Sequence, residues 1–434
     1  MTPIQEKSLP DILAGKDVIA QAKTGSGKTA AFSLGLLSKL DVKRFRIQAL
    51  VLCPTRELAD QVAKEIRRLA RTIHNIKVLT LCGGVSIGPQ IGSLEHGAHI
   101  IVGTPGRIED HLYKRTLKLN DVHTLILDEA DRMLDMGFQP TIDAIIDQIP
   151  EDRQTLLFSA TYPKKIQVIA ERVMKKPVMV QVASMHDNSS IRQHFYQVQD
   201  NKQRLTALRL LLLKQKAEST LVFCNTKKET QEVADALEHE NFSALALHGD
   251  MEQRERDQTL VRFANKSASI LVATDVAARG LDIASLDAVI NYHVARDPEV
   301  YVHRIGRTGR AGSKGIASSL YTEKEHYKIT RLGEHLEQKI KSESLPPFSL
   351  LEKPSSKPSM VTLQIDAGKK DKLRPGDILG ALTGANGIAG KQVGKIHIFN
   401  YHAYVAVHRD AAKPALKKLT EGQLKGRSFR VRRI

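Results

Sequence analysis

The sequence predicts an α/β protein with two successive parallel-sheet domains and a smaller α+β domain at its C-terminus. Short apolar runs alternate with helical patterns, which is typical of a parallel sheet covered by helices on both faces. This alternation occurs twice, with similar length and order of elements. After about residue 345 the pattern changes to a shorter and strongly basic segment.

The first domain is expected to span residues 1–184. Helices are expected up to residue 13 and over residues 29–40 and 57–73. The expected strands are the apolar runs at residues 17–22, 48–53, 77–82, 99–102, 124–127, 155–158 and 178–182.

A polar segment, residues 185–190, is expected to link this domain to a second one at residues 191–345. The second domain repeats the pattern, and two similar domains joined by a hinge favour a ligand site between them. Its expected strands lie at residues 194–198, 220–224, 243–247, 270–273, 288–292 and 316–321. Its expected helices lie at residues 202–214, 227–238 and 252–263, with a charged terminal helix at 323–342.

Four prolines between residues 346 and 358 predict an extended linker before the last domain, residues 359–434. The expected strands there are residues 361–365, 395–399, 403–408 and 428–431, and the expected helices are 375–382 and 411–420. The order β-α-β-β-α-β is that of RNA-recognition-motif (RRM) folds.

Composition excludes several classes of protein. The 434 residues are 41% hydrophobic, which is ample for large cores, and no apolar run approaches the ~18 residues needed to span a bilayer. No signal peptide is expected before the first motif. Cys53, Cys82 and Cys224 lie far apart, which fits neither a zinc site nor a disulfide framework and indicates buried thiols in a reducing cytosol.

The net charge of +17 is concentrated in the last domain. Residues 359–434 hold fifteen Lys and Arg against five Asp and Glu. This surplus predicts a polyanionic partner, most simply nucleic acid. The alternative is a solvated basic surface that aids solubility.

A glycine-rich loop lies between the first expected strand and the next helix. Successive backbone N–H groups in such a loop bind phosphates, and the helix N-terminus adds a favourable dipole. We expect Lys28 to reach the β- and γ-phosphates of a nucleotide and the Thr29 hydroxyl to ligate Mg²⁺. A plain glycine-rich turn is the alternative. The nucleotide-binding candidates in the loop are Ala22 (where the strict pattern has Gly), Lys23, Thr24, Gly25, Ser26, Gly27, Lys28 and Thr29.

Residues 125–131 read Leu-Ile-Leu-Asp-Glu-Ala-Asp, so an apolar strand runs directly into carboxylates. Open α/β sheets place ligands at the carboxyl ends of their strands. We expect Asp128 to hold Mg²⁺ and Glu129 to act as the general base for an attacking water. If the strand continued through both residues, their side chains would point to opposite faces. A strand followed by a polar turn is the alternative.

The run Asp128-Glu-Ala-Asp131 and other motifs in matching order resemble the DEAD-box RNA helicases over residues 1 to about 345. This resemblance implies two RecA-like domains that use ATP and Mg²⁺ and bind RNA. It implies that Gln5 reads adenine, that Asp275 contacts the nucleotide, and that Arg307 and Arg310 complete the ATP site from the second domain. The implied RNA contacts are Pro54, Thr55, Arg56, Gly84, Thr104, Arg107, Thr226, Arg256 and Thr274. The implied coupling residues are Asp131, Ser159, Thr161 and His303, although His303 could also be a core histidine.

The basic tail resembles the C-terminal domain of the DbpA group of DEAD-box proteins, whose members act on large-subunit ribosomal RNA. RRM folds stack bases on aromatic residues of their central strands. The strand at 361–365 has none, which leaves Tyr401, His402 and Tyr404 as stacking candidates around the third strand. Lys391 and Arg427 are candidate RNA contacts by charge.

These observations predict an ATP-dependent RNA helicase that hydrolyses ATP to ADP and phosphate and unwinds short duplexes locally. The resemblance implies a cytoplasmic monomer that the tail directs to 23S-type rRNA and pre-ribosomal particles during ribosome assembly. One alternative is an ATP-gated RNA clamp without turnover, against which the intact Lys28 and Glu129 argue. Another is a DNA translocase on the same paired domains.

Overall fold

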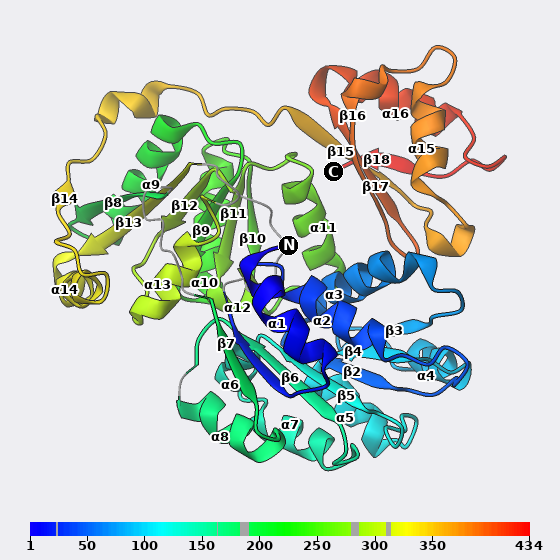
Figure 1. Cartoon of the computed structure of the whole chain (residues 1–434). Coiled ribbons are helices and arrows are strands. Elements are labelled where there is room, and N and C mark those ends of the chain that lie inside the picture. Colours follow the sequence, from blue (N-terminus) through cyan, green and yellow to red (C-terminus); the bar gives the residue numbers. More distant parts are fainter. Residues whose placement is uncertain (23–24, 163, 183–190, 279–285, 310–313) are drawn as a thin grey trace. The chain divides into compact units, whose positions relative to one another are not determined.

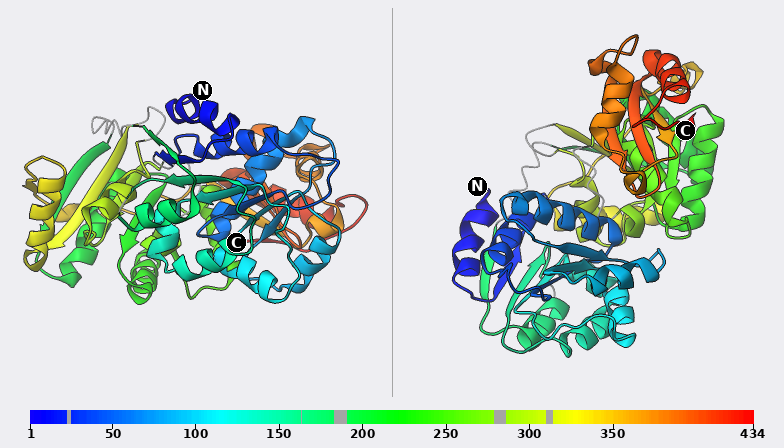
Figure 2. Two further views of the ribbon diagram at one scale, coloured as in Figure 1. Left: turned by 60° about the horizontal axis from the view of Figure 1, so that its bottom comes forward. Right: turned by 90° about the vertical axis from the view of Figure 1, so that its right-hand side faces the viewer.

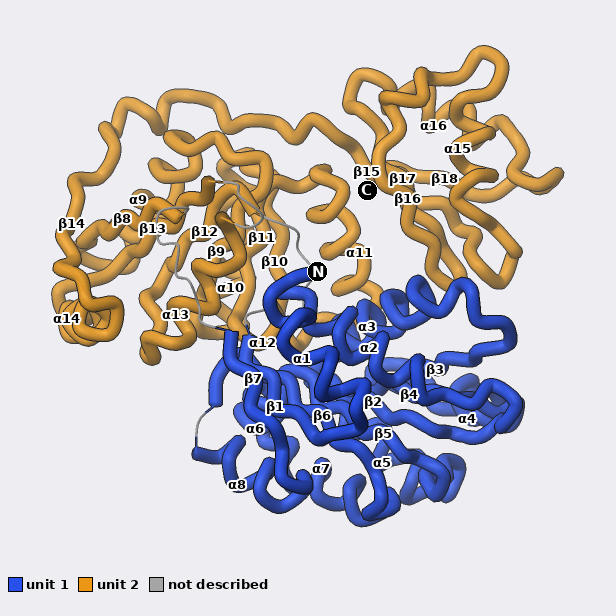
Figure 3. Tube along the Cα trace, in the orientation of Figure 1, with its two compact units in different colours: residues 1–186, 280–282 blue, residues 187–279, 283–434 orange. Residues whose placement is uncertain are grey.

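The computed structural model describes residues 1–22, 25–162, 164–182, 191–278, 286–309 and 314–434 (Figure 1). The expected linker at 185–190 lies outside these residues. The chain divides into two compact units, one of residues 1–186 with 280–282 and one of residues 187–279 with 283–434 (Figure 3). Among the described helices, none has the length and apolar content to cross a membrane.

The first unit is built on a seven-stranded sheet with the order β3-β4-β2-β5-β6-β1-β7, in which all pairings are parallel. The strands are β1 (Val18–Gln21), β2 (Ala49–Leu52), β3 (Val78–Leu81), β4 (Ile100–Gly103), β5 (Thr124–Asp128), β6 (Gln154–Ser159) and β7 (Val178–Gln181). The helices are α1 (Pro3–Leu13), α2 (Lys28–Ser38), α3 (Arg56–Leu69), α4 (Gly88–Glu95), α5 (Pro105–Tyr113), α6 (Ala130–Asp135), α7 (Gln139–Ile146) and α8 (Lys164–Val173).

Both faces of this sheet are buried, which explains why its strands are nearly continuous apolar runs. Residues of α1, α2 and α3 pack on one face around Val51, and residues of α5 to α8 pack on the other face around Leu50 and Leu52. Figure 2 shows these layers from two further directions.

The second unit contains another parallel seven-stranded sheet, with the order β10-β11-β9-β12-β13-β8-β14. The strands are β8 (Ile191–Val198), β9 (Thr220–Cys224), β10 (Ala244–Leu247), β11 (Ile270–Thr274), β12 (Ala288–Asn291), β13 (Gly315–Thr322) and β14 (Ser342–Glu343). The helices are α9 (Asn201–Gln215), α10 (Lys227–His239), α11 (Gln253–Ala264), α12 (Asp275–Ala278), α13 (Pro298–Ile305) and α14 (His326–His335). The two parallel sheets confirm the predicted fold class.

The charged helix expected over residues 323–342 is shorter than predicted. A 3₁₀ turn (Glu323–Glu325) precedes α14, which ends at His335. Glu337 then adopts a left-handed conformation with φ of 52°, and the N–H of Gln338 donates to the carbonyl of Gly333. This reversal lets β14 return to pair with β8, a tertiary pairing that helical periodicity does not reveal.

The C-terminal part of the second unit forms a four-stranded antiparallel sheet, β16-β17-β15-β18, with two helices packed on one face. This confirms the predicted β-α-β-β-α-β order, although the last strand begins later than expected. The elements are β15 (Met360–Ile365), α15 (Pro375–Thr383), β16 (Val393–Ile398), β17 (Ala403–His408), α16 (Ala412–Glu421) and β18 (Val431–Arg433). The preceding segment contains a 3₁₀ helix (Phe348–Glu352) whose Leu350 and Leu351 pack against the second domain's core.

The sheet face opposite α15 and α16 is covered. Thr362 on this face is fully buried and hydrogen bonded to residues that follow α11. Asn265 Nδ2 donates to Thr362 Oγ1 at 3.1 Å, and Ser267 Oγ donates to the carbonyl of Arg262 at 2.9 Å. The Ser267 proton is thus engaged, so Thr362 must donate to Ser267 Oγ across 2.6 Å. These hydrogen bonds connect the four-stranded antiparallel sheet to the second domain.

We expect this contact to be detectable by disulfide formation. Mild oxidation of the double variant Asn265→Cys with Thr362→Cys should cross-link the chain, because the replaced side chains are hydrogen-bonded neighbours. The native cysteines are buried and should not compete. Pairing Asn265→Cys with Thr420→Cys, on the exposed side of α16, provides the control. Equal cross-linking of both pairs on non-reducing gels would contradict the contact.

Candidate ATP and RNA sites

The order of strands in the first sheet brings the predicted ATP residues to one part of its carboxyl edge. Strands β5, β6 and β1 are neighbours, and they lead into Asp128, Ser159 and the glycine-rich loop. Strands β3, β4 and β2 form the other half of the same edge and lead toward Gly84, Thr104 and Thr55. The predicted ATP-binding residues and the predicted RNA-binding residues therefore follow two adjacent groups of strands at the same edge of the sheet.

The glycine-rich loop ends at α2, whose first residue is Lys28. Gly25 and Gly27 have φ of 83° and 93°, a left-handed conformation that favours glycine. Lys28 is buried, and its Nζ donates to the carbonyl of Ala22 at 2.8 Å across the loop. Lys23 and Thr24 lie outside the described residues. This arrangement places Lys28 at the N-terminus of α2, where backbone N–H groups and the helix dipole favour a phosphate.

Gln5 contacts the same loop. Its Oε1 accepts from the N–H of Thr2 at 3.0 Å, and its Nε2 donates to the carbonyl of Gly27 at 3.2 Å. A Cβ atom at Gly27 would lie 2.6 Å from Gln5 Nε2, so only glycine allows this approach. The structure thus brings the predicted adenine-reading residue to the predicted phosphate loop.

The two predicted catalytic carboxylates do not lie on a continuous strand. Strand β5 ends at Asp128, and Glu129 has a φ of 53°, a rare left-handed conformation for a residue other than glycine. The condition for side chains on opposite faces, a strand that continues through both residues, is therefore not met. Both side chains are buried, with 3% and 4% exposed. Arg132 Nη1 lies 2.9 Å from Glu129 Oε2 and neutralises this carboxylate.

Burial raises the pKa of Asp128 to about 7, and the neighbouring Glu129 adds to the shift while Lys28 opposes it. A divalent cation would favour the ionised carboxylate, because positive charge offsets the loss of solvation. The donor set of Asp128 and the Thr29 hydroxyl consists of oxygens, which Mg²⁺ prefers. Asp128 and Thr29 would hold such an ion, which supplies charge neutralisation for phosphoryl transfer when bound.

Asp131 joins the acidic segment to the segment after β6. Its Oδ2 accepts from the N–H of Ala160 at 3.2 Å and from the N–H and hydroxyl of Thr161 at 3.1 and 3.0 Å. Burial opposes ionisation of Asp131, but Lys28 and hydrogen bonds including that from Thr161 outweigh it and lower the pKa. The structure thus brings together Asp131 and Thr161, two of the predicted coupling residues.

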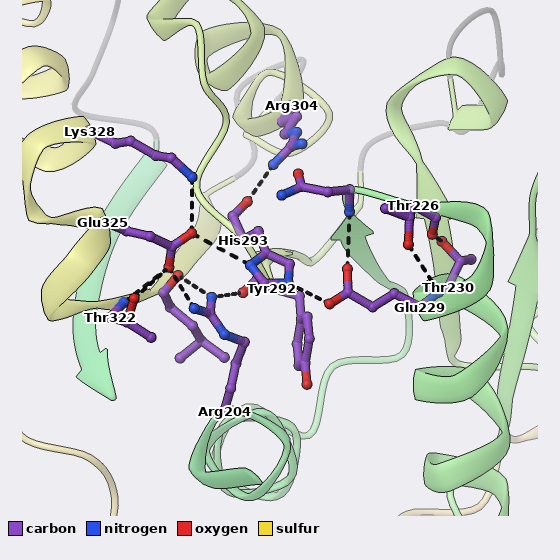
Figure 4. A network of polar contacts seen from close by, with 12 residues as sticks. Arg204, Thr226, Glu229, Thr230, Tyr292, His293, Arg304, Thr322, Glu325 and Lys328 are labelled. Carbon is purple, nitrogen blue, oxygen red and sulfur yellow. Dashed lines mark hydrogen bonds and ion pairs between the residues drawn. The ribbon is translucent and has the colours of Figure 1, made fainter. Parts of the chain in front are cut away.

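In the second unit, Asp275 forms a two-point ion pair with Arg304. Arg304 Nε and Nη2 donate to the two carboxylate oxygens of Asp275, both at 2.7 Å. Its Nη1 donates to the carbonyl of His293 at 2.7 Å (Figure 4). The same nitrogen donates to the side chain of Asn291, and the guanidinium lies over the ring of Phe223. Sequence reasoning missed Arg304, although it stands between two predicted residues, His303 and Arg307.

Arg307 is also buried, at 4% exposed, and follows α13 directly. Arg310 lies outside the described residues. The roles predicted for Arg307, Arg310 and His303 need the first unit and remain predictions.

Several predicted RNA residues lie at helix N-termini. Thr55 and Thr226 are the N-caps of α3 and α10 and accept from the N–H groups of Leu58 and Glu229. Thr104 is the N-cap of α5. These termini present N–H groups and the positive end of a dipole, which suits phosphate oxygens. Pro54 precedes Thr55, and Thr274 ends β11.

Three predicted RNA-binding arginines are held by the protein. Arg56 lies 4.0 Å from Asp60, Arg107 donates to the carbonyl of Val85 at 2.9 Å, and Arg256 donates to that of His248 at 3.2 Å.

In the tail, Tyr401 is 64% exposed, and Lys391 and Arg427 are also exposed. Tyr404 is only 1% exposed. Its sheet face is covered in this structure, and stacking of a base on Tyr404 stays a prediction.

Comparison with known families assigns the chain to a class. The DEAD/DEAH box helicase family matches residues 2–169, and the helicase conserved C-terminal domain matches residues 202–312. The DbpA RNA binding domain matches residues 362–433. The chain belongs to the DEAD-box ATP-dependent RNA helicases and carries a DbpA-type RNA-binding domain.

A relative with the same three parts is the ATP-dependent RNA helicase DbpA of Escherichia coli, which is 54% identical over 432 residues, covering 100% of this chain and 94% of the relative. CshA of Geobacillus kaustophilus is 48% identical over 324 residues, covering 75% of this chain and 69% of the relative. Among solved structures, S. cerevisiae Dbp5 bound to RNA and ADP BeF3 superposes with a TM-score of 0.71 at 28% identity, covering 82% of this chain and 94% of Dbp5.

Replacing Glu129 by glutamine should slow ATP hydrolysis by about 10²- to 10⁴-fold, the usual contribution of a general base. ATP and RNA binding should persist, because the amide keeps the size of the side chain. Phosphate release under RNA-saturated conditions measures the effect, with Glu151→Gln on the exposed surface as the matched control. Wild-type turnover in Glu129→Gln would exclude the base role.

Replacing Lys28 by alanine should weaken ATP binding itself. Loss of a charge-assisted hydrogen bond costs about 1.5–3 kcal/mol, which corresponds to about 10- to 150-fold in Kd. Titration with a fluorescent ATP analogue measures this, and Lys43→Ala, at an exposed lysine, is the control. Unchanged affinity in Lys28→Ala would remove the lysine from the phosphate site.

Proposed function

We propose that this helicase hydrolyses ATP with Lys28, Asp128 and Glu129 of the first unit and Arg307 and Arg310 of the second. The observation that carries the proposal is the convergence of the glycine-rich loop and the acidic pair at neighbouring strand ends. An ATP site needs a phosphate loop, a carboxylate for Mg²⁺ and a water-orienting base, and this edge supplies all three.

In this proposal Glu129 orients a water and accepts its proton as the oxygen attacks the γ-phosphorus. The bond between that phosphorus and the β–γ bridging oxygen breaks, which yields ADP and phosphate. Charge on the γ-phosphoryl oxygens is stabilised by Lys28 and the two arginines. Because the arginines belong to the other unit, hydrolysis requires both units at one nucleotide and is tied to a conformational step.

We propose that RNA binding brings about this conformational step. Helix N-termini and arginines suit phosphates and 2′-hydroxyls, so the two sheet domains would grip one strand with little sequence preference. Gripping a single strand in a path that its complement cannot follow would unwind short duplexes locally.

We further propose that the tail directs the enzyme, as a cytoplasmic monomer, to 23S-type large-subunit rRNA during ribosome assembly. Support comes from the likeness to Escherichia coli DbpA along the whole chain and from the match of residues 362–433 to the DbpA RNA binding domain. The surplus of ten positive charges in residues 359–434 adds electrostatic affinity for RNA.

Removal of residues 359–434 tests this targeting. The shortened chain should keep ATPase activity with unrelated RNA, because the predicted catalytic residues lie upstream, and should lose its preference for 23S rRNA fragments. Steady-state ATPase assays with both RNAs, on full-length and shortened protein, provide the comparison. If the shortened chain kept its preference for 23S rRNA fragments, the specificity for RNA would lie in the two sheet domains and not in the tail.

A further inference from the structure

A network of buried charges lies at the carboxyl ends of β12 and β13 in the second unit (Figure 4). Its centre is His293, whose side chain is 12% exposed. His293 Nε2 lies 2.5 Å from Glu229 Oε1, and Nδ1 lies 3.6 Å from Glu325 Oε1. The ring thus bridges the first turn of α10 and the turn that begins α14.

This geometry favours a charged imidazole. An ionised carboxylate has only acceptors, and a neutral imidazole has one donor and one acceptor. Nε2 lies within hydrogen-bond distance of Glu229 and Nδ1 lies near Glu325, so two negative charges favour a ring that carries both protons. Burial opposes protonation of His293, but Glu229 and Glu325 outweigh it and raise the pKa.

The carboxylate of Glu325 is also paired with basic side chains. Glu325 accepts from Lys328 Nζ at 3.0 Å and pairs with Arg204, which is also hydrogen bonded to the carbonyl of Tyr292. Burial opposes ionisation of Glu325, but His293, Arg204 and Lys328 lower the pKa well below its usual range.

The backbone and ring of His293 reach two predicted functional segments. On one side, Glu229 accepts from the N–H of Asn225 at 3.3 Å and follows Thr226, the predicted RNA contact. On the other, the carbonyl of His293 accepts from Arg304 Nη1 at 2.7 Å. Arg304 holds Asp275, and its helix leads into Arg307.

We propose that His293, in its charged form, is a positioning residue that fixes the RNA-contacting segment at Asn225–Thr226 relative to the Asp275–Arg304 pair during RNA-stimulated ATP hydrolysis. This proposal rests on the proposed function, because it assigns Asp275 and Arg307 to the ATP site and Thr226 to RNA. It adds a residue that touches neither ligand and acts through the segments it joins.

Because the proposed role needs the charged form of His293, RNA-stimulated ATP hydrolysis should depend on pH. The groups facing the ring are Glu229, Glu325 and Arg204, with Lys328 on the far side of Glu325 and Arg304 on the backbone carbonyl. The two carboxylates are ionised at neutral pH, since each has a lowered pKa. The ordinary pKa values of lysine and arginine side chains lie above 9. Burial raises the pKa of the neighbouring Tyr292 hydroxyl and keeps it neutral.

His293 is therefore the member of this network that changes charge between pH 6.5 and 9. A raised histidine pKa means that the charged state is complete below the ordinary value of about 6.5 and is lost as pH rises through the raised value. We therefore expect the positioning effect of His293 on RNA-stimulated ATP hydrolysis to decrease at alkaline pH.

The test compares His293→Gln with His293→Arg in the full-length protein. RNA-stimulated kcat, the half-saturating RNA concentration and ATPase without RNA are measured from pH 6.5 to 9. Wild type should lose RNA stimulation as pH rises. His293→Gln should have stimulation about 2- to 30-fold lower at pH 6.5, a typical effect on coupling, and no alkaline fall. His293→Arg, with a permanent charge, should keep stimulation and also lack the alkaline fall.

The control is His239→Gln at an exposed histidine near the end of α10, which should match wild type. A wild-type pH profile in His293→Gln, or an alkaline fall retained in His293→Arg, would overturn the positioning role. Absence of RNA-stimulated ATPase in the wild type would instead refute the proposed function.

Should His293→Gln fail to fold, the wild-type protein still decides the charge state. Titration of the His293 ring carbons by NMR, in the labelled full-length chain, should give a value above the ordinary 6.5. A value at or below it would overturn the proposal.

Discussion

Pairing of β5 with β6, and of β6 with β1, is the constraint on which the phosphate site depends. Parallel strands in register end at one edge, so Asp128 lies opposite Phe158, and Gln21 lies opposite Ser159. Residues more than 100 positions apart thereby reach one edge of the sheet. Helices pack on both faces and bury this sheet.

Buried charge is the second common feature of the two units. Ionised groups in a protein interior are costly unless paired, and removal of one partner leaves an uncompensated charge. Asp131 is held by the Thr161 segment, and Asp275 by Arg304. In the second unit the same principle extends to a chain of ions from Glu229 through His293 to Glu325. These pairs fix the orientation of loops that would otherwise move independently.

The strands were predictable from sequence because burial on both faces favours nearly continuous apolar runs, as in β2 and in residues 125–127 of β5. The glycine-rich loop and Asp128 were predictable for a chemical reason, since few residue types bind phosphate or Mg²⁺. The left-handed turn at Glu129, the early end of α14 and the covered face at Tyr404 were not. Each depends on tertiary contacts that leave no periodic signal. His293 and Arg304 gave no local signal either, because their partners lie on other elements.

The central claim of the proposed function is that RNA brings about ATP hydrolysis. Phosphate release by the full-length protein, with RNA and with DNA of the same sequence, tests it most directly. Strong stimulation by RNA alone is predicted, because 2′-hydroxyls are part of the contact. Equal stimulation by DNA would contradict the RNA assignment, and turnover that needs neither polymer would contradict the dependence of hydrolysis on a polynucleotide.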